Sequence, residues 1–580
     1  MTAQDHVRRV RGWMILSLGI AVVSLGFVAT TLRDRRAPIE HLVNSDFLSP
    51  ATIYQDFRDG YPVQKYQFSA ALFTFPDVVL YMAIKPFIGD VMTAVLVWEA
   101  ALYMLLVAAA AAVSRSLCRR EERGYVAPAY VCWGALYLLE AFRHFVRPLG
   151  IGDLLWPVSH NGAQVCAFLA AAEVVRLVRA ADGELSKASA GFLTLLCCAA
   201  TFSDRFFVLF FVGPLTLTLG AMAAFSGDRG FAWKAARAIA AVALGVVCGA
   251  VAVAIVRGDQ DPARTMWGGF HLSQLFVKVW WFTTLTFREI RAGNLLALSS
   301  VLWGAYCVTG LVRASLSYRK DGTKPVDVGI FSYQLFWVAQ MGIAAAAYLG
   351  GRVSDGAFAN HSEWPTFSRY FCGPTATAYF GWAFVFAKSA ARLGVRGGAG
   401  FLVPTAACLG SLLLFVKAPP ATERSFADLR PDLVKSMDEV CERAGVHEGL
   451  GDYWAAVPIS CLSRKGVRVR HVIPAKDHPI GFAPYIWLGN PSWYERSRDG
   501  SASHFEFVIA GKYAAEQVSS EELLRTLGEP ARRIAVHSRE LFIYNRPHDE
   551  PLHAFGRRPA SMWTVSDFCR RMSGGDALVR

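Results

Sequence analysis

Two aspartates that follow the first apolar segment are the residues of this chain best placed to transfer a proton. Asp46 lies in the sequence Asn44-Ser45-Asp46, and Asp56 follows about three helical turns later. A carboxylate partly screened from water takes a proton from a hydroxyl group as a general base. We therefore expect Asp46 to be a catalytic base and Asp56 to position the acceptor or the base. A helix N-cap at Asp46 and a solvated helix face at Asp56 are the alternatives.

A second polar set lies where later apolar segments begin or end. Asp204 and Arg205 separate two apolar runs, and His160-Asn161 opens another. Ionisable side chains at such a boundary cost free energy unless they are satisfied internally, which makes them functional candidates. Asp204 could act as a second catalytic acid, Arg205 could hold a phosphate, and His160 and Asn161 could bind substrate. A salt-bridged turn at Asp204 and a hydrogen-bonded structural His160 are the alternatives.

Cationic residues near the same boundaries are candidates for binding an anion. Arg369-Tyr370 opens a late apolar segment, and the planar guanidinium fork binds phosphate oxygens in pairs. Lys278, Arg288 and Arg291 follow one another in an aromatic-rich segment and are weaker candidates for the same charge. An interfacial anchor is the alternative for Arg369.

The apolar residues of the chain are clustered in runs rather than spread evenly. The chain has 580 residues, of which 54% are hydrophobic, and its mean hydropathy is +0.31. This composition excludes an ordinary soluble enzyme and predicts a mainly α, polytopic membrane protein. About eleven segments predict spanning helices: 12–32, 91–113, 125–142, 160–178, 188–203, 206–225, 238–256, 294–312, 328–350, 372–391 and 399–417.

The charge pattern predicts how these helices are oriented. The net charge is +13, but the Lys and Arg residues concentrate in short loops. Such loops are typical of the cytoplasmic face of a membrane, so nucleic acid is not an expected partner. We expect a cytoplasmic N-terminus in a multi-pass membrane protein. The parity of the spans then puts these basic loops on the cytoplasmic side: 114–124, 176–187, 226–237, 313–327 and 392–398.

The composition also predicts two domains. Residues 1–417 form a transmembrane domain whose first external loop, 33–90, carries proline-broken apolar helices suited to the membrane interface. Residues 418–580 are typical of a soluble α+β domain, which an odd number of spans places in the periplasm. Cys441 and Cys461 form either a disulfide or two free thiols. An aromatic-rich region indicates either glycan binding or an aromatic core: Tyr453, Trp454, Tyr485, Trp487, Asn490, Trp493 and Tyr494.

Acidic and histidine residues of the sequence lack the spacing of metal ligands. We therefore expect no metal and no other cofactor. A divalent cation held by distant carboxylates, such as Asp46 and Asp204, is the alternative.

The layout as a whole resembles the C-type glycosyltransferases (GT-C) of membranes, which transfer a sugar from a polyprenyl-phosphate carrier. The resemblance rests on one helix, a long acidic first external loop, a further helix bundle, an aromatic and basic late loop, and a C-terminal extracytoplasmic domain. It implies that Asp46 is the catalytic carboxylate and that Arg369-Tyr370 meets the lipid phosphate. It also implies an inverting transfer from a polyprenyl-phosphate sugar donor to a glycan or lipid-linked acceptor of the cell envelope, without a metal.

Other function classes remain open on the sequence. An envelope polysaccharide polymerase or ligase also uses external arginines, but with a different helix order and a pyrophosphate-linked donor. A transporter or flippase predicts inverted repeats and a polar site near mid-membrane, whereas the sequence has no matching halves and gathers its polar residues at one face. A scaffold of the cell envelope would tolerate substitution of all these charges.

Overall fold

The computed structural model describes most of the chain up to Tyr544. The described residues are 3–34, 45, 47–62, 66, 72–145, 160–179, 187–257, 272–291, 295–321, 327–350, 371–393, 428, 430–474, 482–484, 489–494, 505–511, 519–537 and 539–544. They contain sixteen α-helices and six strands.

The chain folds as two compact units, each built from segments that are distant in sequence. We call them the helical unit and the mixed unit. The helical unit comprises Met1–Pro38, Ala100–Gly258 and Met266–Glu423. The mixed unit comprises Ile39–Glu99, Asp259–Thr265 and Arg424–Arg580.

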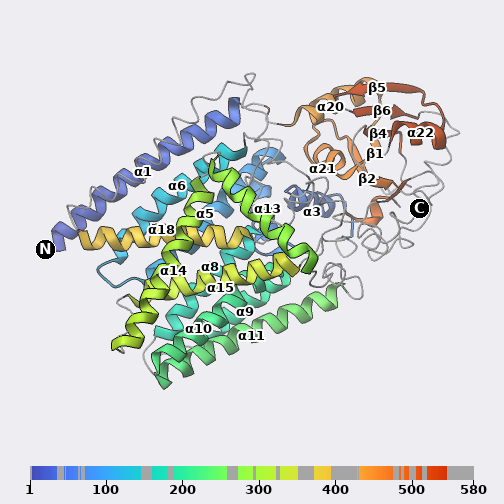
Figure 1. The fold of residues 1–580 in the computed structure, drawn as a ribbon. Coiled ribbons are helices and arrows are strands. Elements are labelled where there is room, and N and C mark those ends of the chain that lie inside the picture. The colour runs from blue at the N-terminus through green and yellow to red at the C-terminus, as the bar shows by residue number, and fades with distance from the viewer. Residues whose placement is uncertain are drawn as a thin grey trace. The chain divides into compact units, whose positions relative to one another are not determined.

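Long apolar helices make up the helical unit (Figure 1). Their bounds are α1 (Ala3–Asp34), α5 (Val91–Leu117, which begins in the mixed unit), α6 (Val126–Phe145), α8 (Asn161–Arg179), α9 (Lys187–Ser203), α10 (Gly213–Ser226), α11 (Arg229–Arg257), α13 (Leu272–Arg291), α14 (Leu295–Asp321), α15 (Val328–Gly350) and α18 (Cys372–Leu393).

Six of the described helices are long and apolar enough to cross a membrane, as expected of a multi-pass membrane protein. These segments are Val91–Leu117, Asn161–Arg179, Val208–Ser226, Arg229–Val256, Ala297–Ser317 and Val328–Leu349.

The expectation of eleven spans is therefore larger than the number that the described residues support. Four further expected spans are helical, as α1, α6, α9 and α18, but do not belong to the six. In α9 the reason is length, because it has only 17 residues. The last expected span, 399–417, lies outside the described residues.

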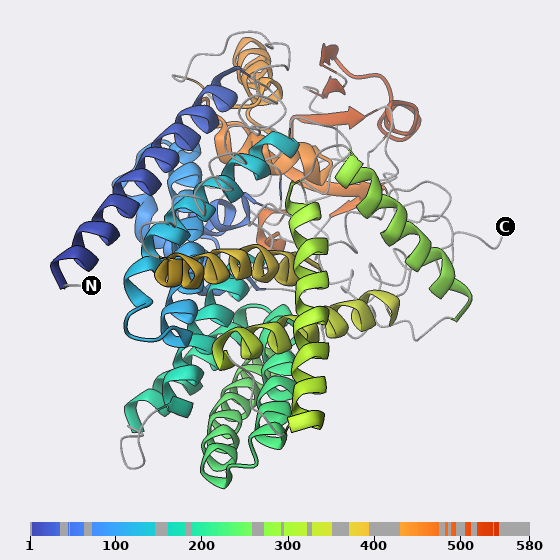
Figure 2. The ribbon, with the colours of Figure 1, turned by 60° about the vertical axis from the view of Figure 1, so that its left-hand side comes forward.

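The α9 and α11 helices pack closely, and they lie side by side in both views (Figures 1 and 2). Gly245 and Gly249 of α11 face the α9 backbone. A Cβ atom on Gly245 would lie 2.4 Å from the carbonyl oxygen of Thr194, and one on Gly249 would lie 2.6 Å from that of Cys198. Small residues four apart allow this close approach, which is a common basis of helix association in membranes.

Buried charges at one end of the helical unit join several basic segments. The Lys388 ammonium lies 3.1 Å from the Glu122 carboxylate and 3.0 Å from that of Asp327. Arg179 donates to carbonyl groups at the end of α5. These contacts bring residues of the expected basic loops 114–124, 176–187 and 313–327 together, and they satisfy the charge of the buried Lys388 side chain.

A mixed β-sheet is the centre of the mixed unit. β1 (Glu448–Gly451) pairs in parallel with β2 (Arg468–Pro474) and β4 (Phe507–Gly511), and β6 (Arg539–Ile543) pairs antiparallel with β4 and β5 (Arg532–Val536). The short β3 (Phe482–Pro484) adds antiparallel to β2, which gives the order β3-β2-β1-β4-β6-β5. The helices of this region are α20 (Asp432–Ala444), α21 (Tyr453–Leu462) and α22 (Ser520–Leu527). The C-terminal region is therefore α+β, as expected.

The first loop packs into the same core as this sheet. It forms α3 (Ser49–Arg58), the π-helical turn η2 (Thr74–Val78), α4 (Val79–Ile84) and the 3-10 turn η3 (Lys85–Phe87). Residues of both segments share one apolar cluster, which includes Ile53, Tyr61, Tyr66 and Val78 of the loop and Leu450, Val472, Phe482 and Trp493 of the C-terminal region. This loop was expected to belong to the transmembrane domain, because local composition does not reveal a contact of such long range.

Cys441 and Cys461 are separate, buried thiols, so the structure contains no disulfide between them. Instead, the Cys461 sulfur lies 3.2 Å from the hydroxyl oxygen of Thr52 on α3. This contact joins the first loop to α21.

Replacement of Gly245 by alanine should destabilise the helical unit, because the new methyl group overlaps the α9 backbone. The expected loss is about 1–3 kcal/mol. Gly220→Ala on α10 is the matched control, because nothing lies within 4 Å of its Cβ position. Thermal unfolding of the full-length protein in detergent gives the unfolding midpoint of each variant. Equal midpoints for the two variants would contradict the close packing.

Candidate functional site

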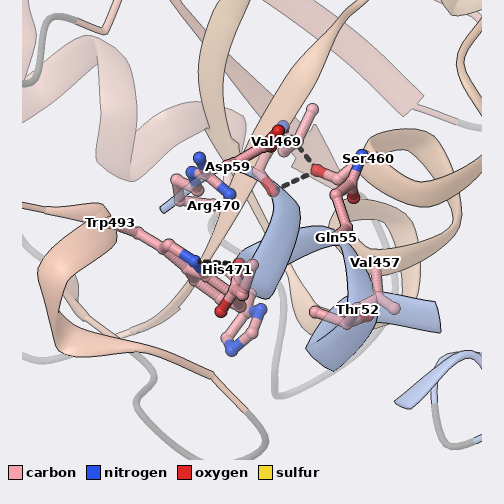
Figure 3. Close-up of a pocket in the computed structure, with 10 residues that line it drawn as sticks. Thr52, Gln55, Asp59, Val457, Ser460, Val469, Arg470, His471 and Trp493 are labelled. Atoms are coloured by element: carbon pink, nitrogen blue, oxygen red, sulfur yellow. Dashed lines mark hydrogen bonds between the residues drawn. The ribbon is translucent and has the colours of Figure 1, made fainter. Parts of the chain in front are cut away.

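A polar cavity lies inside the mixed unit, where α3 meets α21 and β2. It is small, with a volume of about 10 Å³, which is room for about one water molecule. Figure 3 shows side chains from α3 converging on side chains from β2, α21 and the Trp493 segment. The lining residues are Thr52, Gln55, Asp56, Asp59, Val457, Ser460, Val469, Arg470, His471 and Trp493.

Local sequence signals place Asp56 in the last turn of α3. Pro50 occupies the first turn, where proline fits without loss of a hydrogen bond. Gly60 takes a left-handed conformation with φ of +76°, so the chain reverses and the Tyr61 N–H binds the Asp56 carbonyl at 2.9 Å. At the other end of the segment, the Ser45 hydroxyl donates to the Tyr453 carbonyl at 2.8 Å. The helix is thus held at both ends.

The Asp56 carboxyl group is 97% buried, since its residue retains only 3% of its accessible surface. The Trp493 indole N–H donates to Oδ1 at 2.7 Å, whereas Oδ2 has no hydrogen-bond partner among the described residues. Burial raises the pKa of Asp56 from its ordinary 3.8 to about 7, against the opposing effects of the Arg470 charge and the Trp493 bond. The carboxyl group can therefore take up or release a proton near neutral pH.

Arg470 supplies a buried positive charge beside this carboxyl group. Its guanidinium lies 4.9 Å from the centre of the Trp493 ring and 5.5 Å from that of Tyr61, and it donates to the Tyr61 hydroxyl at 3.2 Å. Its Nε atom is buried without a partner among the described residues. Arg468, on the same face of β2, pairs instead with Asp59 at 3.3 Å.

The aromatic residues around the cavity are part of the core rather than a surface for stacking. Tyr453, Trp493 and Tyr494 are buried, and the His471 ring meets Trp493 and Tyr453 edge to face. Trp454 is the exposed member of the expected aromatic region. Tyr485 and Trp487 lie outside the described residues. For the buried members, the aromatic-core alternative therefore describes the structure.

A second polar pair lies in the helical unit. His160 Nδ1 lies 2.5 Å from Asp204 Oδ2, and both side chains are buried. The other Asp204 oxygen accepts the Phe206 N–H at 2.9 Å, and the Phe206 ring lies 4.1 Å from the His160 ring. Asp204 thus closes the turn after α9 and binds the residue that precedes α8. The side-chain partner of Asp204 in this turn is His160.

The remaining candidate residues have different surroundings. Asn161 begins α8, and its buried Oδ1 has no partner among the described residues. Arg205 is half-buried. The buried Lys278 donates to the Leu349 carbonyl at 3.0 Å, so its charge interacts with the C-terminal end of α15. Three candidates lie outside the described residues: Asp46, Arg369 and Tyr370. Arg288 belongs to α13, but its side chain is not described.

Arg470, which lies beside Asp56 but far from it in sequence, was not among the residues expected at the site. The available signal was the alternation Arg468-Val469-Arg470, because alternate residues of a strand point to the same face. Trp493 was noted only as one aromatic residue among several. The described part of the chain brings no three acidic, histidine or cysteine side chains together as a potential metal site.

Comparison with known proteins gives this chain no family. No protein-family model matches the sequence, and no curated protein matches it significantly.

Asp56→Asn should remove a pH dependence from the stability of the first-loop segment. A carboxyl group with a raised pKa binds its proton more tightly in the folded state, so it stabilises most below pH 3.8 and less as the pH rises towards 7. Above pH 7, Asn should therefore increase the free energy of local opening by about 2–4 kcal/mol. Below pH 4, the neutral wild type and the variant should be similar.

Hydrogen exchange of peptides covering 45–62 tests this expectation in the full-length protein. Wild type and variant are compared at each pH, so that the intrinsic pH dependence of exchange cancels. A wild-type segment that is equally protected at pH 5 and pH 8, relative to the variant, would show that Asp56 has no raised pKa.

Proposed function

We propose that this protein is an integral membrane glycosyltransferase of the C-type fold. It transfers a sugar from a polyprenyl-phosphate donor to a glycan or lipid-linked acceptor outside the cytoplasm of a bacterial cell. The six long apolar helices and the resemblance of the layout support the membrane location. In this proposal the N-terminus is cytoplasmic and the mixed unit lies in the periplasm.

One observation carries the proposal: the carboxyl group of Asp56, in the first loop, is buried near the Arg470 guanidinium. The pKa of this carboxyl group is raised to about 7. A general base works best when its pKa lies near the working pH, because it then takes the proton readily and also releases it. Such perturbed groups in cavities are candidates for function. The first loop is also where the resemblance places the catalytic carboxylate.

The chemistry requires one proton transfer and one displacement. As the acceptor hydroxyl oxygen attacks the anomeric carbon, the bond from that carbon to the donor phosphate breaks, and the configuration inverts. The acceptor proton passes to the base, and the phosphate leaves with the bonding electrons. We assign Asp56 as the base, because its surroundings suit the role. Asp46, the choice from the sequence, is the second carboxylate of the same loop.

Other residues are assigned to substrate binding in the same proposal. Arg205 and the Arg369-Tyr370 pair would bind the donor phosphate, for which the guanidinium fork is suited. The His160–Asp204 pair is buried and polar within an apolar bundle, which makes it a functional candidate within the helical unit. Lys278 is left out, because its ammonium group binds carbonyl oxygens of α15.

Asp56→Asn should lower the rate of sugar transfer by roughly 10²–10⁴-fold, the usual contribution of a general base. The assay uses membranes containing the full-length protein and a panel of polyprenyl-monophosphate sugars with radiolabelled sugar groups. Asp46→Asn should reduce the rate less. Glu442→Gln is the control, because this carboxylate is exposed on α20. Full activity of the Asp56 variant would falsify the assignment of the base, and no transfer from any donor would contradict the glycosyltransferase proposal.

A further inference from the structure

The residues around the Asp56 carboxyl group belong to two parts of the chain that are far apart in sequence. Asp56 belongs to the first loop, whereas Arg470 and Trp493 belong to the C-terminal region of the mixed unit. We propose that Arg470 and Trp493 are positioning residues that hold the Asp56 carboxyl group in one orientation, with Oδ1 bound and Oδ2 left to exchange a proton. This inference rests on the proposed function and adds the C-terminal region to its catalytic apparatus.

Trp493 fixes the orientation of the carboxyl group. Its indole N–H is the donor to Oδ1 at 2.7 Å, and a flat ring that is 97% buried has little freedom to turn away. Tyr66 and His471 meet this ring edge to face, at centroid distances of 6.4 and 5.3 Å. Because the indole donates to Oδ1, Oδ2 is left as a buried oxygen without a hydrogen-bond partner among the described residues.

Arg470 acts through space rather than through a direct bond. Its guanidinium contacts the rings of both Trp493 and Tyr61, and it donates to the Tyr61 hydroxyl. It therefore attracts the negative charge of Asp56 without a hydrogen bond to Oδ2. An ion pair made directly to Oδ2 would instead compete with proton transfer at that atom.

Other titratable and charged groups also face Asp56. His471 from β2 and Asp59 from α3 line the same cavity, and Cys461 from α21 and Tyr61 and Tyr66 of the first loop interact electrostatically with Asp56. Arg468 and Asp59 pair with each other, so their charges largely offset. Burial raises the pKa of Cys461 to about 11 and that of Tyr66 well above its ordinary value, so both remain neutral between pH 5 and pH 9. The His471 imidazole is the other titratable side chain that lines this cavity.

The test measures the titration midpoint of Asp56 without substrate. Hydrogen exchange of peptides covering 45–62 is followed from pH 5 to pH 9 in the full-length protein, and each protein is compared with its own Asp56→Asn partner. Arg470→Gln should move the midpoint upward by about one pH unit, because the ionised carboxylate loses its cation. Trp493→Phe should also move it upward, because Oδ1 loses its donor. Arg470→Lys should restore most of the wild-type midpoint.

Arg443→Gln is the control, since this arginine is exposed on α20 and donates only to a carbonyl of its own helix in the described structure. Its midpoint should match that of the wild type. Unchanged midpoints in both Arg470→Gln and Trp493→Phe would overturn the inference. If Arg470→Gln fails to fold, Trp493→Phe and Arg470→Lys decide it. Because no substrate is present, an unmoved midpoint contradicts the positioning role, whereas absent sugar transfer contradicts the proposed function.

Discussion

The burial of one carboxyl group against the C-terminal sheet is the constraint on which the candidate site depends. Removing the Asp56 carboxyl group from water is costly, and the fold compensates only in part, with an indole N–H and a nearby guanidinium. The remaining cost is what raises the pKa of the group towards neutrality. The same helix is fixed by the Asp59–Arg468 pair and by the contact between Thr52 and Cys461, so the buried carboxyl group is flanked by satisfied polar contacts.

In the helical unit, too, buried polar groups depend on partners within the protein. In an apolar bundle, a polar side chain needs a partner within the protein. Asp204 has His160, Lys388 has two carboxylates, and Lys278 has the end of α15. Where helices must approach closely, glycines replace larger residues, as in α11 against α9. The bundle is therefore organised by a few specific contacts as well as by its apolar surface.

Local signals in the sequence predicted most helices, because an apolar run long enough to span a membrane also favours a helix. They overstated the spans, since a helix such as α9 can be apolar but short. The sequence also identified His160 and Asp204 as candidates from their positions at segment ends, and Asp56 as a carboxylate of the first loop. It could not pair His160 with Asp204, or Asp56 with Arg470 and Trp493, because these contacts depend on tertiary packing. The role of the first loop in the C-terminal core was missed for the same reason.

The central claim is that α3 packs against α21, and a disulfide tests it most directly. Thr52→Cys would place a second sulfur beside Cys461, since the Thr52 hydroxyl oxygen lies 3.2 Å from the Cys461 sulfur. Mild oxidation of the full-length protein, followed by digestion and mass spectrometry, should yield a disulfide-linked pair of peptides that contain position 52 and Cys461. Phe57→Cys, at a 64% exposed position of the same helix, should yield no such pair. Equal linkage in both variants, or none in Thr52→Cys, would contradict this packing.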